Sequence, residues 1–357
     1  MRLRSHLGDW IAHLLPDTTA AARGAARSLV RALLCGYTTR LVDLARQSDH
    51  SESARTARQF FSRWLDRPHW QPQEIYTRLQ PYVRQLLADR CGSVVLLVDT
   101  TFLQNQWAVL QVSVVWQGRA LPLYRVVSRW ESPEEGQREL LFQALTWLSA
   151  HLPGQRRRYI LVMDRGFPSH ELIRRLTQDG WRFVIRIKGM WKMTVGQYAG
   201  AVAAGPWQKP LQIFRDAELG SRDKGEGTRI RHSLADVVRA FDPDAKEPWY
   251  LVTNLATAAA AVASYAERMK IEEEFRDLKG HLGLDHLATW QSVHKVARLL
   301  AWIAVYEWWL AFQWRKHTLE AWGRKQWVGG KLSWIRVARL WIAWNIRSQG
   351  AGVLDGL

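Results

Sequence analysis

Two short aliphatic runs, each followed directly by an aspartate, constrain the fold of this chain most strongly. Residues 94–98 (VVLLV) precede Asp99, and residues 159–163 (YILVM) precede Asp164. Continuous apolar runs of this length are typical of central strands that are buried on both faces. A buried acid is costly unless a cation compensates it. A lone aspartate in this place reads first as a turn or cap residue, but two adjacent strands ending in aspartate can converge on one cation.

The order of the predicted elements indicates an α/β fold with a mixed sheet and helices. Three strands are followed by a helix, a strand, a helix and a strand. Their predicted ranges are 93–98, 107–116, 120–127, 133–151, 159–163, 169–179 and 181–187. This β-β-β-α-β-α-β order is that of an RNase H-like core.

The pattern outside these elements predicts further regions. Residues 1–90 are expected to form a helical DNA-binding region, and 91–187 the first part of the catalytic core. Residues 188–247 are irregular with strand-like pieces and are interpreted as a β-rich insertion. Residues 248–285 would form the second part of the core, with a strand and one long helix over 256–279. Residues 286–357 are expected to be helical and rich in tryptophan.

The charge of the chain favours a nucleic-acid partner. Its 357 residues carry 50 Lys and Arg against 33 Asp and Glu, a formal net charge of +17. Neutralising DNA phosphates releases condensed counterions, so such an excess favours double-stranded DNA. An anionic membrane is the alternative, but the chain has no polybasic tail. Arg55, Arg58 and Arg63 cluster on one predicted helix, which fits either DNA binding or a solvated face.

Cysteine usage and hydropathy predict a cytoplasmic protein. Cys35 and Cys91 are too few for a disulfide framework or a cysteine zinc site. The first ten residues lack the apolar stretch of a secretory signal. The most apolar segment, 296–314, contains Arg298 and Glu307, so we expect a buried helix and no membrane span.

A third acid lies on the predicted helix over 256–279. Tyr265, Arg268, Glu272 and Lys279 are separated by offsets that place them on one stripe of a continuous helix. A solvated helix face with ion pairs would explain the charges, but it does not explain the two strand-end aspartates. Three carboxylates without His or Cys favour hard cations, so two Mg²⁺ ions are expected, with Mn²⁺ as a substitute. Asp99, Asp164 and Glu272 would then catalyse phosphodiester hydrolysis and transesterification.

The segment Tyr265 to Lys279 matches the pattern Y-x2-R-x3-E-x6-K at every fixed position. In this it resembles the DDE transposases of bacterial insertion sequences, specifically insertion-sequence family 4, over about residues 31–341. The resemblance implies cut-and-paste excision and integration of a DNA element through a hairpin intermediate. It also implies terminal inverted repeats and target DNA as partners, and a homodimer in the synaptic complex. A bacterial protein associated with the nucleoid is a further implication of the resemblance.

The resemblance also implies roles for single residues. Tyr265, Arg268 and Lys279 would hold DNA phosphates near the cleaved end. Arg165 belongs to a stretch, Asp164 to Phe167, that looks like the second-aspartate motif of the family, and it is expected to contact DNA. Trp249 matches a tryptophan that stacks on a flipped base in similar transposases, while a core tryptophan at a strand start is the alternative. Unlike many relatives, the chain has threonine, not a second acid, directly after Asp99.

Two other functions stay open at this point. A nuclease or resolvase with the same core would hydrolyse DNA without joining it, and a catalytically silent DNA-binding protein would retain the acids without activity. The tryptophan-rich region from Trp290 to Trp344 is interpreted first as core packing and second as a DNA or dimer contact.

Overall fold

The computed structural model describes residues 6–36, 38–47, 53–66, 70–88, 92–130, 133–152, 154, 156–222, 230–241, 247–316 and 334–349. The chain divides into two compact units. The first comprises Met1–Arg90, Thr100–Leu152 and Glu273–Leu357, and the second comprises Cys91–Asp99 and Pro153–Glu272. Two elements, β1 (Val94–Leu103) and α9 (Met269–His281), begin in the second unit and end in the first.

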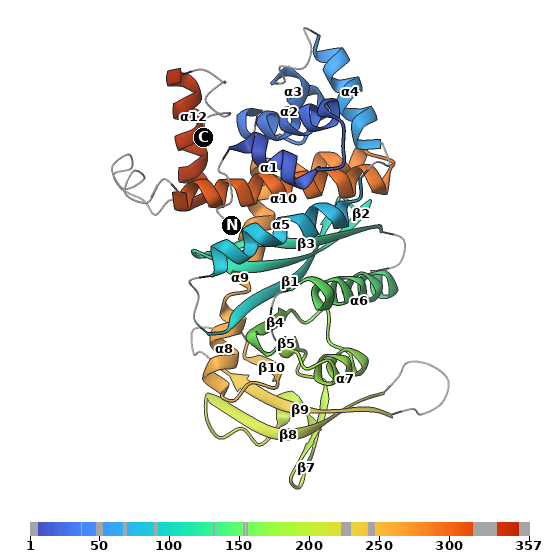
Figure 1. The fold of residues 1–357 in the computed structure, drawn as a ribbon. Coiled ribbons are helices and arrows are strands. Elements are labelled where there is room, and N and C mark those ends of the chain that lie inside the picture. Colours follow the sequence, from blue (N-terminus) through green and yellow to red (C-terminus); the bar gives the residue numbers. More distant parts are fainter. Residues whose placement is uncertain are drawn as a thin grey trace. The chain divides into compact units, whose positions relative to one another are not determined.

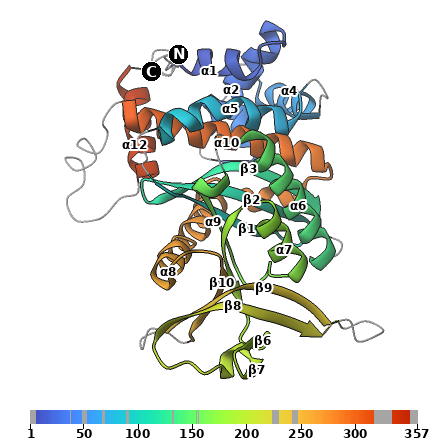
Figure 2. The same ribbon diagram turned by 60° about the horizontal axis from the view of Figure 1, so that its bottom comes forward.

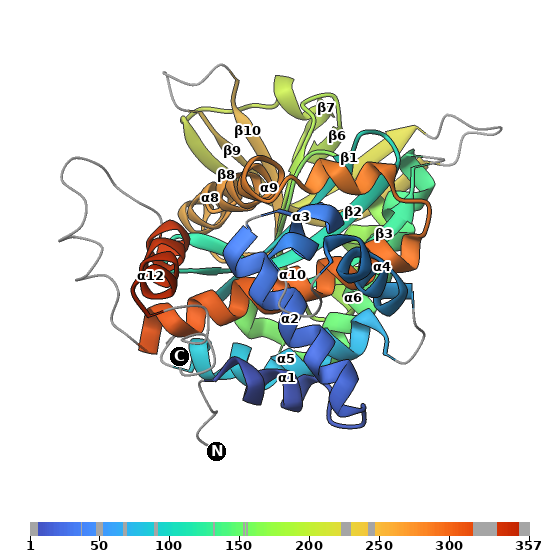
Figure 3. The ribbon, with the colours of Figure 1, turned by 90° about the horizontal axis from the view of Figure 1, so that it is seen from above.

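The helices of the first unit gather around one long helix, α10 (Val293–Lys316), which is shown in orange among the blue helices in Figures 1 and 3. It packs against α2 (Ala20–Gly36), α4 (Ala54–Asp66), α5 (Pro72–Leu87) and α12 (Trp334–Gln349). The shorter elements are α1 (Leu7–Leu14), α3 (Leu41–Arg46) and the 3-10 turn η3 (Leu284–Thr289). The predicted helical character of residues 1–90 is therefore present in the described residues.

Most of the tryptophans of α10 are buried in the core. Trp302, Trp308 and Trp309 are fully buried, and the indole N–H of Trp308 donates to the carbonyl oxygen of Pro122 at 2.6 Å. Trp344 on α12 is 54% exposed. The first interpretation of the tryptophan-rich region, core packing, thus holds for α10. No helix in the described ranges is long and apolar enough to cross a membrane.

A β-hairpin forms the sheet portion of the first unit. β2 (Trp107–Trp116) and β3 (Arg119–Arg129) pair antiparallel, with Trp116 opposite Arg119. The two residues between them, Gln117 and Gly118, both have positive φ. Positive φ at both positions is typical of two-residue hairpin turns, because it matches the right-handed twist of the flanking strands. α6 (Pro133–His151) and α10 pack on this hairpin.

The second unit is built on parallel central strands. Residues Val94 to Val98 of β1 pair in parallel with β4 (Tyr159–Met163), and β4 pairs in parallel with β5 (Arg182–Ile187). β10 (Trp249–Thr253) then adds to β5 antiparallel. α7 (His170–Gln178) follows β4, and its N-cap Ser169 accepts a hydrogen bond from the Leu172 N–H. α8 (Ala258–Ala266) follows β10, and η1 (Arg156–Arg158) precedes β4.

The strand order gives the fold class. From the hairpin onward, the order is β3-β2-β1-β4-β5, with β2 and β3 antiparallel and β1, β4 and β5 parallel. This is the RNase H-like arrangement that the order of elements in the sequence predicts. The mixed α/β fold with an RNase H-like core is thus confirmed.

The segment 188–247 is more regular than predicted. It contains β6 (Lys192–Val195), β7 (Tyr198–Ala201), η2 (Val202–Ala204), β8 (Leu211–Arg222) and β9 (Ile230–Ala240). β8 and β9 form a long antiparallel pair whose β9 edge joins β10 (Figure 2). The scattered Gly, Pro and charged residues suggested irregular structure, but the long-range pairing with β10 overrides that local signal.

Candidate active site

Asp99 and Asp164 lie next to each other at the edge of a parallel strand pair. Val98 of β1 is directly opposite Met163, the last residue of β4, and each aspartate is the next residue along the chain. Contrary to the prediction, β1 does not end before Asp99 but continues to Leu103. The pairing of β1 with β4 does end before Asp99, at Val98 and Met163. Asp99 therefore still lies at the end of the parallel strand pair.

The guanidinium of Arg268 contacts all three predicted acids. Its Nη1 lies 3.2 Å from Asp99 Oδ2, and its Nη2 lies 3.3 Å from Asp164 Oδ2 and 2.6 Å from Glu272 Oε1. The side chain of Arg268 is 12% exposed, and those of the three acids are 19%, 25% and 35% exposed, respectively. The structure therefore brings Asp99, Asp164 and Glu272, which are distant in sequence, to one cationic group within the second unit.

Electrostatics explain why this arginine stays charged. Burial alone would lower the pKa of Arg268, but Asp164 and then Asp99 more than offset that effect and raise the pKa above its ordinary value. A fully ionised guanidinium can hold several carboxylates by charge-assisted hydrogen bonds. The cluster is thus a set of three acids with one built-in counter-charge.

The helix expected over residues 256–279 is broken, so that prediction is wrong. α8 ends at Ala266 and α9 begins at Met269. Across the break, the N–H groups of Arg268, Lys270 and Ile271 donate to carbonyls only three residues back, so the regular pattern of the α-helix is interrupted. Tyr265 and Glu272 therefore lie on different helices, and the break places Arg268 at the junction.

Tyr265 reaches the same acids from α8. Its hydroxyl donates to Asp164 Oδ1 at 3.0 Å. Burial first, and then the charge of Asp164, raise the pKa of Tyr265 to about 12. The ring of Trp249, half-buried at the start of β10, lies 4.9 Å from the Tyr265 ring in an edge-to-face arrangement. Trp249 is thus linked to the carboxylates through one tyrosine.

Lys279 and Arg165 make other contacts. The ammonium of Lys279 donates to the carbonyl oxygen of Phe102 at 2.9 Å within the first unit. Arg165 is half-exposed and lies 3.2 Å from Glu247 Oε1. Tyr265, Arg268 and Glu272 therefore meet at the carboxylates in spite of the helix break, whereas Lys279 contacts Phe102.

The sequence did not single out Arg186 as a site residue. It pairs with Glu247 at 2.5 Å, is 16% exposed, and its charge acts on Tyr265. Arg186 lies on β5 opposite Leu251 of β10, so only the strand register brings it near Tyr265. One signal in the sequence could have identified Arg186: it is a basic residue near the end of the predicted strand 181–187, which follows Asp164.

The three acids suit a metal chemically, although Arg268 now lies among them. Within the described residues, no group of three or more His, Cys, Asp and Glu side chains is arranged to hold a metal ion. In this structure the guanidinium of Arg268 bridges the three carboxylates. Carboxylates alone, without imidazole or thiolate, are the donors that hard divalent cations prefer. A divalent cation, with more charge than the guanidinium of Arg268, could neutralise the same three carboxylates.

Comparison with known families decides the class of this site. The family model described as "Transposase DDE domain" matches residues 92–308, which contain all three acids and Arg268. The chain belongs to the DDE transposase family. It is an enzyme of that family, with an RNase H-like core.

Comparison with individual proteins adds little to the family assignment. One solved structure, a cryo-EM structure of a piggyBac transposase synaptic complex with hairpin DNA, is 12% identical to this transposase. The match covers 97% of this chain and 77% of that one, with a TM-score of 0.39. No curated protein matches the sequence.

Proposed function

We propose that this transposase belongs to insertion-sequence family 4 and moves a DNA element by cut-and-paste. The observation that carries the proposal is the convergence of Asp99, Asp164 and Glu272 on Arg268. The Y-x2-R-x3-E-x6-K spacing supports the finer family assignment. The large positive charge supports DNA as the partner. Excision followed by integration requires both hydrolysis of phosphodiester bonds and strand transfer.

Asp99, Asp164 and Glu272 are the proposed catalytic and metal-ligating residues. Their oxygen donors would hold two Mg²⁺ ions, or Mn²⁺ in their place. When bound, such ions lower the pKa of the attacking water or hydroxyl and offset charge on the reacting phosphate. The residues themselves orient the reacting groups: the parallel register fixes Asp99 beside Asp164, and α9 supplies Glu272.

The neighbouring residues would bind and orient DNA. Tyr265, Arg268 and Lys279 are proposed to contact phosphates near the cleaved end, and Arg165, which is half-exposed, to contact DNA close by. Trp249 is proposed as the stacking platform for a flipped base. Its half-buried ring, edge-on to Tyr265, supports this proposal because a stacking platform needs an accessible face close to the acids.

The assembly and organisation follow from the same proposal. Two element ends must be joined in concert, so a homodimer on the terminal inverted repeats is proposed. The division into a helical DNA-binding region (1–90), a core interrupted by the insertion 188–247, and a helical C-terminal region (286–357) is part of the proposal. A hairpin on the element end would be the intermediate.

The test is strand cleavage and joining by the purified full chain. Wild type and Glu272→Ala are incubated with Mg²⁺ and DNA carrying candidate terminal inverted repeats. Glu273→Ala is the matched control, because Glu273 is adjacent but pairs with Arg119 at 3.0 Å. Hairpin and joined products in wild type and Glu273→Ala, but not in Glu272→Ala, support transposition. Nicks without joining would indicate a nuclease or resolvase, and binding without cleavage a silent DNA-binding protein.

A further inference from the structure

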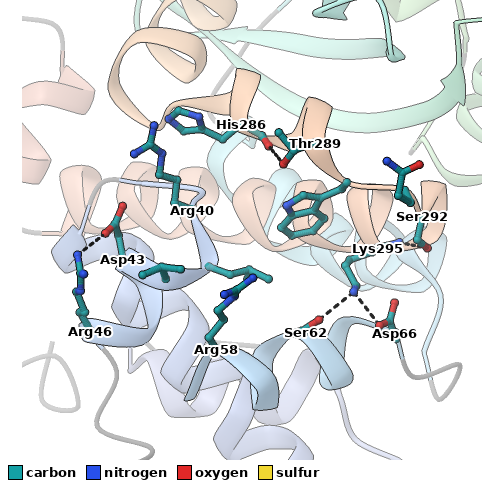
Figure 4. A pocket seen from close by; sticks show the side chains of 14 residues that line it. Arg40, Asp43, Arg46, Arg58, Ser62, Asp66, His286, Thr289, Ser292 and Lys295 are labelled. Atoms are coloured by element: carbon teal, nitrogen blue, oxygen red, sulfur yellow. Dashed lines mark hydrogen bonds and ion pairs between the residues drawn. The ribbon is translucent and has the colours of Figure 1, made fainter. Parts of the chain in front are cut away.

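A basic pocket separate from the carboxylate cluster lies wholly in the first unit. Its volume is about 950 Å³, and it opens between α3–α4 on one side and the segment from η3 to the start of α10 on the other. In Figure 4, Arg40, Arg46 and Arg58 come from the blue N-terminal segment, and His286, Ser292 and Lys295 come from the orange segment. The pocket thus joins residues more than 200 positions apart in the chain.

The acids of this pocket are already neutralised. Asp43 lies 3.0 Å from Arg46, and Asp66 lies 2.7 Å from the ammonium of Lys295. Lys295 also donates to the hydroxyl of Ser62 at 3.0 Å, as the dashed lines in Figure 4 show. These contacts tie α10 to α4, so the two walls are held together before any ligand arrives.

Two arginines remain uncompensated. Arg40 and Arg58 both line the pocket and are exposed, and neither has an acidic partner within the described ranges. With Asp43 and Asp66 paired, the pocket carries a surplus of about two positive charges at neutral pH. Two guanidinium groups that face open solvent in a preformed pocket are suited to bind phosphate oxygens.

An aromatic wall completes the pocket. Trp290 is half-buried, and the Lys295 ammonium lies 5.9 Å from its ring centroid. The lining therefore combines fixed cations, free guanidinium groups and one flat apolar surface. Sugar-phosphate backbone has the same alternation of anionic and apolar parts, whereas a small inorganic anion would leave most of the volume unfilled.

We propose that this pocket is a second DNA-binding site, which holds the phosphodiester backbone of duplex DNA through Arg40 and Arg58. It would position the DNA without reading its sequence, because phosphate contacts fix register and carry no base information. The site rests on DNA being the partner of this transposase, as proposed above. Of residues 1–90, which are expected to bind DNA, the proposal assigns backbone contacts to Arg40 before α3 and to Arg58 on α4, and it adds residues of the segment 286–295.

The test is binding of a fluorescently labelled, mixed-sequence duplex to the full chain in EDTA, which keeps metal-dependent contacts out of the measurement. Arg58→Gln should weaken binding by about tenfold and reduce the slope of log K against log salt by about 1. Arg40→Gln with Arg58→Gln should reduce the slope by about 2. Arg63→Gln is the matched control, because Arg63 is exposed on the same helix but does not line the pocket.

Equal loss of affinity in Arg58→Gln and Arg63→Gln would overturn the proposal, since binding would then depend on overall charge or another face of α4. The proposal would also be overturned if Arg58→Gln bound DNA normally but lost affinity for a polyglutamate peptide, since the pocket would then bind an acidic peptide and not DNA. Cleavage is assayed separately with Mg²⁺. If Arg58→Gln binds and cleaves DNA as wild type does, only the proposal for the pocket is contradicted. If wild type does not cleave DNA but Arg58→Gln still shows the expected loss of binding, only the proposed function is contradicted.

Discussion

Arg268 Nη2 lies 2.6 Å from Glu272 Oε1, across the junction where α8 ends and α9 begins. The same guanidinium contacts Asp99 and Asp164. In the structure, one arginine therefore supplies the positive charge that allows three partly buried acids to gather. Its removal should leave those acids facing one another without a counter-charge.

Arg268→Ala should lower the free energy of unfolding by about 1–2 kcal/mol at neutral pH in metal-free buffer. Because a divalent cation can replace the lost charge, added Mg²⁺ should restore more stability to this variant than to wild type. Urea unfolding with and without Mg²⁺ measures both effects. Arg119→Ala is the control, since Arg119 pairs with Glu273 and Asp277 instead. An identical Mg²⁺ effect on all three proteins would contradict the interpretation.

Tyr265→Phe should remove a stabilising contribution that depends on alkaline pH. The pKa of Tyr265 is raised from 10.0 to about 12 in the folded protein. The unfolded chain therefore loses this proton first, so the contribution is complete below about pH 10 and is lost as pH rises toward about 12. The full effect is about 2–3 kcal/mol. Compared with Tyr198→Phe, the Tyr265→Phe variant should show a flatter fall in stability over that range. Parallel curves for the two variants would show that burial of Tyr265 does not control its ionisation.

The buried ion cluster of the first unit gives a stability prediction. Arg125 lies 3.1 Å from Glu274 Oε1 and 2.8 Å from Glu307 Oε2, and all three side chains are almost fully buried. Arg125→Met leaves two buried acids without their cation, which should cost about 3–5 kcal/mol of folding stability. Chemical denaturation measures the loss. A loss below about 1 kcal/mol would mean that the cluster relaxes without penalty.

Glu274→Gln should have a pH-dependent effect on stability. Burial, and then the charge of Glu307, raise the pKa of Glu274 well above 4.5. Its contribution to stability is therefore present below the ordinary pKa and is lost as pH rises. Since glutamine does not titrate, the variant should gain stability relative to wild type as pH rises above about 4.5. Glu273→Gln, at a more exposed pair, should show no such gain, and a constant difference for Glu274→Gln would refute the assignment.

Trp249→Ala should impair hairpin formation more than the initial nick, because base stacking would be needed only once the base has left the duplex. Trp249→Phe should retain part of the activity, since it keeps an aromatic face. Time courses of nicked and hairpin products on end-labelled DNA separate the two steps. Equal loss of both steps would count against a stacking role.

The parts of the fold and site that depend on local pattern could be predicted from the sequence. The aliphatic runs before Asp99 and Asp164 indicated central strands, and the order of the predicted elements indicated the RNase H-like core. The break between α8 and α9 could not be predicted, because residues 256–279 favour helix locally while Arg268 is held by Asp99 on β1 and by Asp164 directly after β4. The basic pocket was also not predictable, since it needs Arg58 and Lys295 to meet through tertiary packing.

Metal-directed backbone cleavage tests the central claim most directly. Fe²⁺ in place of Mg²⁺, with ascorbate and peroxide, cuts the chain close to the bound ion, and fragment mass spectrometry locates the cuts. We predict cuts near Asp99, Asp164 and Glu272 together, all of which are abolished by excess Mg²⁺ and by Asp164→Asn. Cuts near only one of the three residues, or cuts that persist in Asp164→Asn, would contradict a shared cation site.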